Sequence, residues 1–180
     1  MIAKSVDLVD DIVNCSTIII NCLRNNGSLI LFGNGGSAAD AQHIAAEFVG
    51  LLRVTDTRGA FNAIALTTNT SVITALVNDA MFTELFSRQL TAVGRPGDVV
   101  IGISTSGTSE NVINGLLAAK KGGMHTIGFT GETGGKIVDI ADLTIKMPSK
   151  DTPRIQEGHI TIGHILCDVV MKTLQEDMNV

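Results

Sequence analysis

Cysteine is scarce in this 180-residue chain, and none of its three cysteines has another at the C-x-x-C spacing. Cys15, Cys22 and Cys167 instead lie within apolar helical patterns, which indicates reduced thiols packed in the interior. No apolar run reaches the length of a membrane span, and the N-terminal segment, with three aspartates and one lysine, does not resemble a secretory signal. We therefore expect a cytoplasmic protein without a membrane partner.

Clusters of positive charge are absent as well. Lys and Arg number 13 against 18 Asp and Glu, and the formal net charge is −5. Nucleic-acid backbones are bound through concentrated positive charge, so this composition argues against a nucleic-acid partner. A small-molecule ligand fits the composition better.

The chain also lacks an interdomain linker, a low-complexity tract and an internal repeat. With 180 residues and 44% hydrophobic content it can bury a sizeable core, and we expect one domain over residues 1–180. Within it, residues 1–27 are predicted to form a packing helix and residues 28–180 an α/β core. Residues 53–59 and 131–135 are predicted to be mobile loops.

Short apolar segments alternate with helical patterns along the core. The predicted strands are residues 29–32, 63–66, 99–103, 126–129 and 143–147, and the predicted helices are residues 38–49, 71–77, 82–93, 110–121 and 153–174. None of the strands alternates between apolar and polar residues, which is typical of strands covered on both faces. The pattern predicts a three-layer α/β/α sandwich with a five-stranded parallel sheet.

A further helix is predicted over residues 6–25, with Gly27 at its C-terminal cap. Its apolar face is wider than packing against one sheet requires. Part of this face is therefore expected to pack on another subunit, which predicts a homo-oligomer.

The first motif, GNGGS, follows the strand at 29–32 and places Ser37 as the N-cap of the next helix. Glycines allow the backbone to approach a ligand closely, and a helix start favours an anion. The same letters match the dinucleotide pattern G-x-G-x-x-A at Gly33, Gly35 and Ala38. That alternative is weaker, because the strand at 63–66 is followed by two threonines and offers no acidic residue for a ribose.

His43 and Glu47 stand four residues apart on the predicted helix and therefore share one face. Such a pair can chelate one ion or serve one substrate, although it also occurs as an ordinary surface contact. Alanines make up much of the same helix, as if a backbone or a ligand had to approach it closely.

A second motif, STSGTS, places five hydroxyls in six residues at the start of the helix that follows the third strand. This arrangement suits a phosphate bound by hydroxyls and backbone N–H groups without a lysine. The hydroxyls could also only cap the helix, but they are more numerous than one cap uses. Because ligands bind at the carboxyl ends of parallel strands, GNGGS, Asn78-Asp79 and STSGTS are expected on one rim of the sheet.

The third motif, RIQEGHITIGH, opens the last predicted helix with Gln156, His159 and His164 among apolar residues. A hydrogen-bonded core or surface role is the default for a single histidine in such a helix. Gln156 and His164 are eight residues apart, which on one helix means about 12 Å of rise and roughly 80° of rotation. They could meet at one ion only if both side chains leaned together; otherwise a neighbouring subunit supplies part of the site.

Together, GNGGSAADAQHIAAE, the Asn78-Asp79 corner followed by FSRQL, STSGTSENV and RIQEGHITIGH resemble the phosphoheptose isomerase family of SIS (sugar isomerase) domains over nearly the whole chain. The resemblance implies an aldose–ketose isomerase that converts D-sedoheptulose 7-phosphate into D-glycero-D-manno-heptose 7-phosphate, towards nucleotide-activated heptose for surface polysaccharide. It also implies one zinc ion per subunit and a homotetramer with active sites between subunits.

The resemblance assigns the family's functional positions to residues of this chain. Glu47 is implied as the catalytic base and His164 as the acid. The implied zinc ligands are His43, Glu47, Gln156 and His164. The expected substrate-binding residues are Asn34, Gly35, Gly36, Ser37, Glu47, Asn78, Asp79, Ser104, Thr105, Ser106, Ser109 and Gln156. The chain departs from its relatives at Leu51, where they usually have Arg, and at Thr108, where Asn is more usual.

A non-catalytic protein of the same fold, which binds the bacterial replication initiator, is the alternative from another functional class. Its pattern lacks the counterparts of Glu47 and His164, and this chain has both. The same two residues argue against a metal-free sensor of sugar phosphates.

Overall fold

The structure is a computed structural model that describes residues 8–50 and 60–178. Leu51 and the predicted mobile loop at 53–59 therefore lie outside the described residues. The strands are β1 (Leu29–Gly33), β2 (Ala63–Ala65), β3 (Val99–Ile103), β4 (His125–Thr130) and β5 (Leu143–Lys146). The helices are α1 (Val9–Arg24), α2 (Gly36–Val49), α3 (Thr70–Asn78), α4 (Leu85–Val93), α5 (Glu110–Lys121) and α6 (Thr152–Met178), with short 3-10 helices η2 (Phe82–Glu84) and η3 (Ile137–Asp139).

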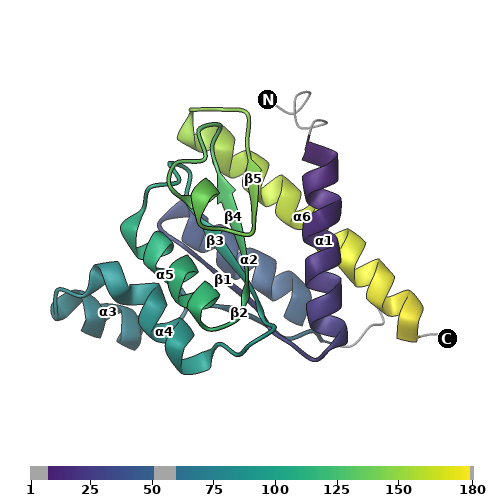
Figure 1. The fold of residues 1–180 in the computed structure, drawn as a ribbon, viewed down its shortest axis with the longest axis horizontal. Coiled ribbons are helices and arrows are strands. Elements are labelled where there is room, and N and C mark those ends of the chain that lie inside the picture. Colours follow the sequence, from purple (N-terminus) through teal and green to yellow (C-terminus); the bar gives the residue numbers. More distant parts are fainter. Residues whose placement is uncertain (1–7, 51–59, 179–180) are drawn as a thin grey trace.

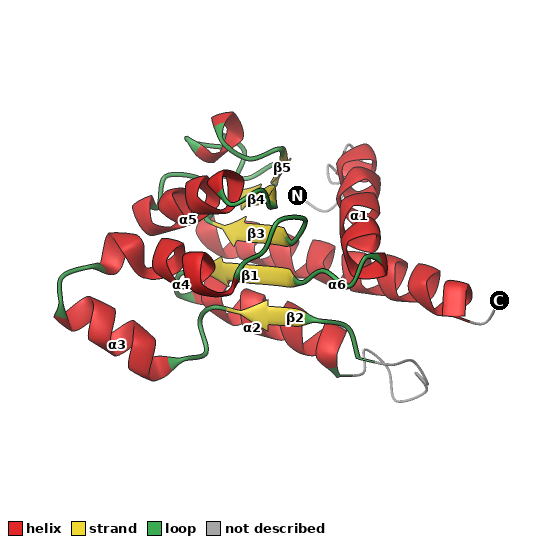
Figure 2. Ribbon diagram, turned by 60° about the horizontal axis from the view of Figure 1, so that its bottom comes forward, coloured by secondary structure: helices red, strands yellow, loops and turns green. Residues whose placement is uncertain are grey.

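The five strands form one parallel sheet in the order β2-β1-β3-β4-β5, which confirms the predicted sheet (Figure 2). From β1 the chain crosses to β2 on one side, whereas β3, β4 and β5 follow on the other. The order therefore reverses between β1 and β3, and in such sheets ligands bind at this reversal, outside the carboxyl ends of the strands. GNGGS and STSGTS follow these two strands.

Helices cover both faces of the sheet, which confirms the predicted three-layer architecture (Figures 1 and 2). Alternate residues of β1 point to opposite faces. Leu29 and Leu31 belong to the core beneath α1, α2 and α6, whereas Ile30 and Phe32 belong to the core beneath α4 and α5. The ring of Phe32 stacks on Phe86 of α4, with centroids 4.7 Å apart. Burial of both faces explains why the strands read as uninterrupted apolar runs.

The ends of two helices differ from the predictions. Helix α1 ends in a Schellman arrangement in which Asn26 takes the left-handed conformation (φ 58°) and Gly27 N–H donates to the Cys22 carbonyl over 2.9 Å. The residue at the left-handed position is thus Asn26 and not Gly27. Ser37 is not the N-cap of α2, because Gly35 (φ 56°) caps the helix and α2 begins at Gly36. The positive φ, which glycine adopts readily, turns the chain into the helix earlier than the serine suggested.

Two further helices also differ from their predicted bounds. The helix predicted over 82–93 is divided into η2 and α4, and the last helix continues to Met178 rather than ending near Leu174. Pro153 lies in the first turn of α6, as predicted, where its missing N–H costs no hydrogen bond.

His159 fills the default role expected for a histidine in α6. Its ring is fully buried, Nε2 lies 3.1 Å from the Thr130 carbonyl at the end of β4, and the ring packs near Phe129. Burial lowers its pKa from the ordinary 6.5 to about 4, so the imidazole is neutral at pH 7 and Nε2 donates to the carbonyl.

This buried imidazole should make the fold sensitive to acid. The unfolded chain binds a proton at His159 below about pH 6.5 and the folded chain only near pH 4, so stability falls as the pH drops between these values. His159→Gln keeps an N–H donor but does not titrate. Between pH 7 and pH 5 its free energy of unfolding should therefore fall by about 2 kcal/mol less than that of the parent chain. Urea unfolding at both pH values and one protein concentration measures this; equal losses would contradict it.

Candidate active site

Helices α2 and α6 pack side by side. They run in the same direction, since Gln156 near the start of α6 lies against Gly36 at the start of α2, and His164 lies against His43 further along. Gly163 of α6 permits the close approach, since a Cβ there would lie 2.6 Å from Ile44 Cδ1 of α2. His164, the next residue of α6, consequently meets His43, the residue before Ile44. Two histidines that are 121 residues apart in the chain are brought together by this contact.

Glu47 completes a cluster of three side chains with His43 and His164. The two Nε2 atoms lie 2.9 Å apart, and Glu47 Oε1 lies 3.3 Å from His43 Nε2. One ligand-capable atom from each of the three residues lies within 4.8 Å of the others. Two imidazole nitrogens and a carboxylate oxygen at this spacing are a donor set that transition metals prefer, so the cluster could hold a metal ion. The predicted shared face of His43 and Glu47 is confirmed.

Gln156, the fourth predicted ligand, lies at the other end of the α2–α6 contact. Its amide packs on Gly36, where a Cβ would lie 2.8 Å from Gln156 Cδ. Gly36 and His43 are seven residues apart on α2, which separates their levels by about 10 Å. The structure thus brings His43, Glu47 and His164 together, and Gln156, whose amide lies beside Gly36 in the turn after β1, stays a predicted ligand.

The serines of STSGTS form a cluster of hydroxyls at the start of α5. Ser104 is buried, and its Oγ lies 2.9 Å from Ser109 Oγ and 3.4 Å from Ser106 Oγ. Ser109 is the N-cap residue of α5, yet its side chain makes no capping hydrogen bond. Ser104 and Ser109 therefore do not serve the helix end, which weakens the capping alternative. Ser106 does accept the Thr108 N–H over 3.2 Å, so part of this loop is a local turn.

Backbone donors are available beside both loops. Among the described residues, the N–H groups of Gly35 and Gly36 have no acceptor, and neither do those of residues 109–111 at the start of α5. The positive end of the helix macrodipole adds to each set. The two loops that leave the sheet at its reversal thus present donors suited to an anion.

Asn34, also a predicted substrate residue, uses its side chain within the protein. Its Nδ2 donates to Oδ1 of Asn111 and its Oδ1 accepts from Nδ2 of Asn111, each over 2.8 Å. Asn111 was not singled out from the sequence, although it lies within STSGTSENV, two residues after Ser109. The signal that the sequence offered was an amide side chain in the first turn of a helix that follows a predicted ligand loop.

The other predicted residues lie at the edges of this region. Asn78 ends α3 and donates to Asp79 Oδ1 over 3.2 Å; both are exposed and, among the described residues, neither is hydrogen-bonded to GNGGS or STSGTS. Thr105 and Ser106 line a hollow of about 200 Å³ together with residues that include Glu132 and Lys150. The turn predicted to be mobile at 131–135 is hydrogen-bonded to STSGTS, since Gly131 N–H donates to the Thr105 carbonyl.

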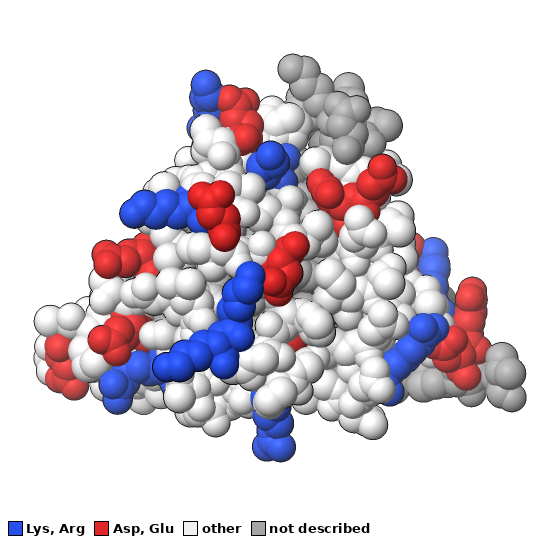
Figure 3. All heavy atoms as spheres, viewed as in Figure 1, with Lys and Arg blue, Asp and Glu red and all other residues white. Residues whose placement is uncertain are grey.

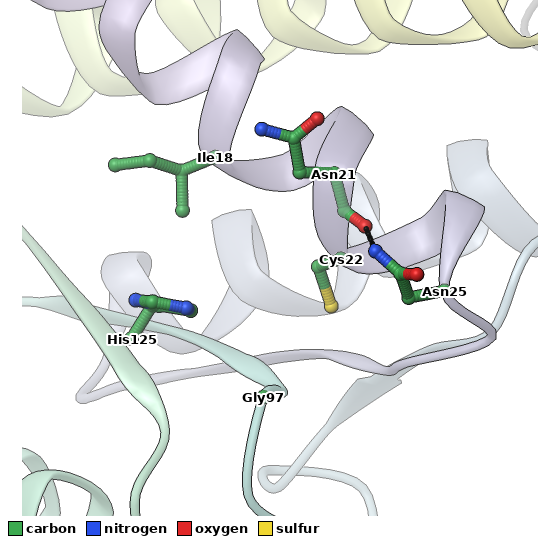
Figure 4. A pocket seen from close by; sticks show the side chains of 6 residues that line it. All are labelled: Ile18, Asn21, Cys22, Asn25, Gly97 and His125. Carbon is green, nitrogen blue, oxygen red and sulfur yellow. Dashed lines mark hydrogen bonds between the residues drawn. The ribbon is translucent and has the colours of Figure 1, made fainter.

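A separate pocket of about 350 Å³ lies at the amino-terminal ends of the strands, beside α1 and the first residue of β4 (Figure 4). Its lining residues are Ile18, Asn21, Cys22, Asn25, Gly97 and His125. Burial raises the pKa of the Cys22 thiol to about 11, so this cysteine is not a nucleophile at neutral pH. The pocket shares no residue with the rim loops or with the histidine cluster.

Charge is spread rather than gathered on the face that Figure 3 shows, where acidic and basic side chains are interspersed. None of the described helices combines the length and the apolar character needed to cross a membrane. All three cysteines are buried, and none of them forms a disulfide.

Comparisons with known proteins agree with this geometry. The SIS domain family model matches residues 3–131. A phosphoheptose isomerase from Roseiflexus sp. is 54% identical over 92% of this chain and 83% of its own length. This chain belongs to the phosphoheptose isomerase family of SIS-domain proteins. It is therefore an enzyme, an isomerase.

Two solved structures of the family support the same assignment. A phosphoheptose isomerase from Neisseria gonorrhoeae superposes with a TM-score of 0.85 at 43% identity and covers 95% of both chains. One from Francisella tularensis gives a TM-score of 0.86 at 33% identity, covering 90% of this chain and 85% of its own. The isomerase fold thus extends over nearly all of the chain.

The histidine cluster predicts a measurable metal affinity. His43→Asn or His164→Asn removes one nitrogen of the donor set and should weaken binding of Zn²⁺ at least about tenfold, since even second-layer changes around metal sites cost this much. Calorimetric titration of the metal-stripped protein measures the affinity. His125→Asn, which changes an exposed histidine on β4, is the control and should bind as the parent does. Unchanged affinity in both cluster variants would contradict a metal site here.

Proposed function

We propose that this isomerase interconverts D-sedoheptulose 7-phosphate and D-glycero-D-manno-heptose 7-phosphate. The observation that carries the proposal is the convergence of His43, Glu47 and His164. It places a carboxylate and imidazoles, the groups that proton transfer needs, in one cluster. The substrate is taken from the name that the relatives carry, phosphoheptose isomerase.

The chemistry moves one carbon-bound proton and one oxygen-bound proton. Glu47 removes a proton from C1 of the ketose to form a cis-enediol and then delivers a proton to C2, so the carboxylate ends the cycle unprotonated. While the enediol exists, the proton on Glu47 can exchange with solvent. His164 delivers a proton to the oxygen on C2 and accepts one from the oxygen on C1. Each residue is regenerated, and the aldose has the same composition as the ketose.

We further propose that the resident metal is zinc, one ion per chain. His43, Glu47 and His164 supply two nitrogens and one oxygen, and Gln156 remains a predicted fourth ligand. A zinc ion bound there would polarise the sugar oxygens and stabilise the charge of the enediolate.

The phosphate is assigned to the serine loop. Ser104, Ser106 and Ser109 gather their hydroxyls at the start of α5, and the donors of residues 109–111 are free of other described partners. A dianion suits this place without a lysine, because the helix start supplies positive partial charge. The sugar chain would then lie between this loop, the glycine turn and the histidine cluster.

A homotetramer with sites shared between subunits is proposed from the exposure of the cluster. His43 and His164 are both exposed, although a reactive enediol needs protection from water. Apolar side chains are also exposed on α1 at Val9 (52%) and Val13 (57%) and on α6 at Ile165 (41%) and Val169 (41%). A second copy of the chain would cover such surfaces and supply walls to the site. We also propose that residues 1–180 act as one domain. The cytoplasm is the proposed location of the protein.

Replacing either the proposed base or the proposed acid should abolish most of the activity. Glu47→Gln and His164→Gln keep similar shapes but cannot transfer the protons, so turnover of D-sedoheptulose 7-phosphate should fall at least about a hundredfold. A coupled assay of heptose phosphate formation measures it, together with the metal content of each variant. Glu157→Gln, on an exposed carboxylate that pairs with Arg154, is the control. Near-normal turnover in either test variant removes that residue from its role.

Loss of the serine hydroxyls should weaken binding more than chemistry. Ser104→Ala, Ser106→Ala and Ser109→Ala should each weaken sugar phosphate binding by about 1 kcal/mol or more, the usual contribution of a hydrogen bond to a charged group. The Michaelis constant reports the change. Ser87→Ala on α4 removes a hydroxyl that donates to the Glu84 carbonyl and should have no effect. Three unchanged Michaelis constants would overturn the phosphate assignment.

A further inference from the structure

Asn111 lies where the two rim loops meet, and nothing in the proton transfer uses it. It is the second residue of α5 and only 3% exposed, a high degree of burial for a polar side chain. Its amide is paired head to head with that of Asn34, the residue that directly follows β1, and both hydrogen bonds measure 2.8 Å. The pair therefore ties the loop after β1 to the helix after β3.

This tie crosses the place where the strand order reverses. Strands β1 and β3 are neighbours, and the chain leaves them towards opposite faces of the sheet, into α2 and α5. The loops that carry the donors could therefore move relative to each other unless something joins them. The Asn34–Asn111 pair is such a joint, because an amide pair is held by two hydrogen bonds and resists rotation.

The glycine turn needs such a constraint more than most segments do. Gly35 has a φ of 56° and, like Gly36, is exposed, and glycine has the largest backbone freedom of any residue. The N–H groups of these two glycines donate to no other described residue, so they are the donors that the turn offers to a ligand. The side chain of Asn34 is directed at Asn111 and fixes one end of the turn.

We propose that Asn111 is a positioning residue for the sugar phosphate: through its amide pair with Asn34 it holds the N–H groups of Gly35 and Gly36 in place relative to the serine loop. One ligand can then be held by both loops at once. This inference rests on the proposed function, since it assigns the ligand to that same site. In this proposal the side chain of Asn34 has a structural role, and the backbone N–H groups of the turn contact the ligand.

A double-mutant cycle in the full-length protein tests the inference. Asn111→Leu, Asn34→Leu and the double variant are compared with Asn114→Leu, which removes a matched amide from the same helix, one that donates to the Thr83 carbonyl. Asn111→Leu should raise the Michaelis constant for D-sedoheptulose 7-phosphate about tenfold and change kcat less than about threefold, as expected when binding is lost equally in ground and transition states. The double variant should bind about as poorly as the weaker single variant, because both act on one pair.

Calorimetric binding of D-sedoheptulose 7-phosphate is measured beside turnover, and thermal unfolding confirms that each variant is folded. Unchanged binding in folded Asn111→Leu would overturn the inference, and so would additive losses from Asn34→Leu and Asn111→Leu. Loss of kcat alone would also count against it. If the parent chain and Asn114→Leu bind the sugar phosphate without turning it over, the proposed isomerisation fails, while the binding data still decide the role of Asn111.

Discussion

The close packing of α6 on α2 is the contact on which the rest of the site depends. Gly163 lets α6 approach Ile44, and this approach puts His164 within 2.9 Å of His43. The same pair of helices, running in one direction, places Gln156 against Gly36 at the start of α2. One helix contact thus positions both the metal-capable cluster and Gln156. Along α2, Gly36, which Gln156 contacts, lies about two helical turns before His43.

The sheet supplies the second constraint, because its order reverses between β1 and β3. A doubly wound sheet sends the chain to opposite faces at this point, which opens a place for a ligand between two helix starts. Here the serine hydroxyls and the free N–H groups face that place, and the Asn34–Asn111 pair joins its two sides. We therefore propose that the rim binds the anion and that the α2–α6 contact carries out the proton transfer.

Local patterns in the sequence predicted what depends on nearby residues. The apolar runs gave the five strands, and the spacing of four gave the shared face of His43 and Glu47. The meeting of His43 with His164 depends on how two helices pack, which no local pattern encodes, and it was expected only through the family resemblance. The helix caps predicted at Ser37 and Gly27 were wrong, because the ends of these helices are set by the backbone conformation, with positive φ at Gly35 and Asn26. The amide partner of Asn34 likewise lies 77 residues away.

The central claim is that Glu47 moves the carbon-bound proton of a sugar phosphate through an enediol. Isomerisation of D-sedoheptulose 7-phosphate in deuterated water, followed by NMR, tests it most directly. We predict that deuterium enters the aldose product at C2 and, through the reverse reaction, the ketose at C1, because a carboxylate base exchanges its proton with solvent. Product that retains only protium at C2 over many turnovers would contradict proton transfer through Glu47, and the absence of any aldose would contradict the isomerase itself.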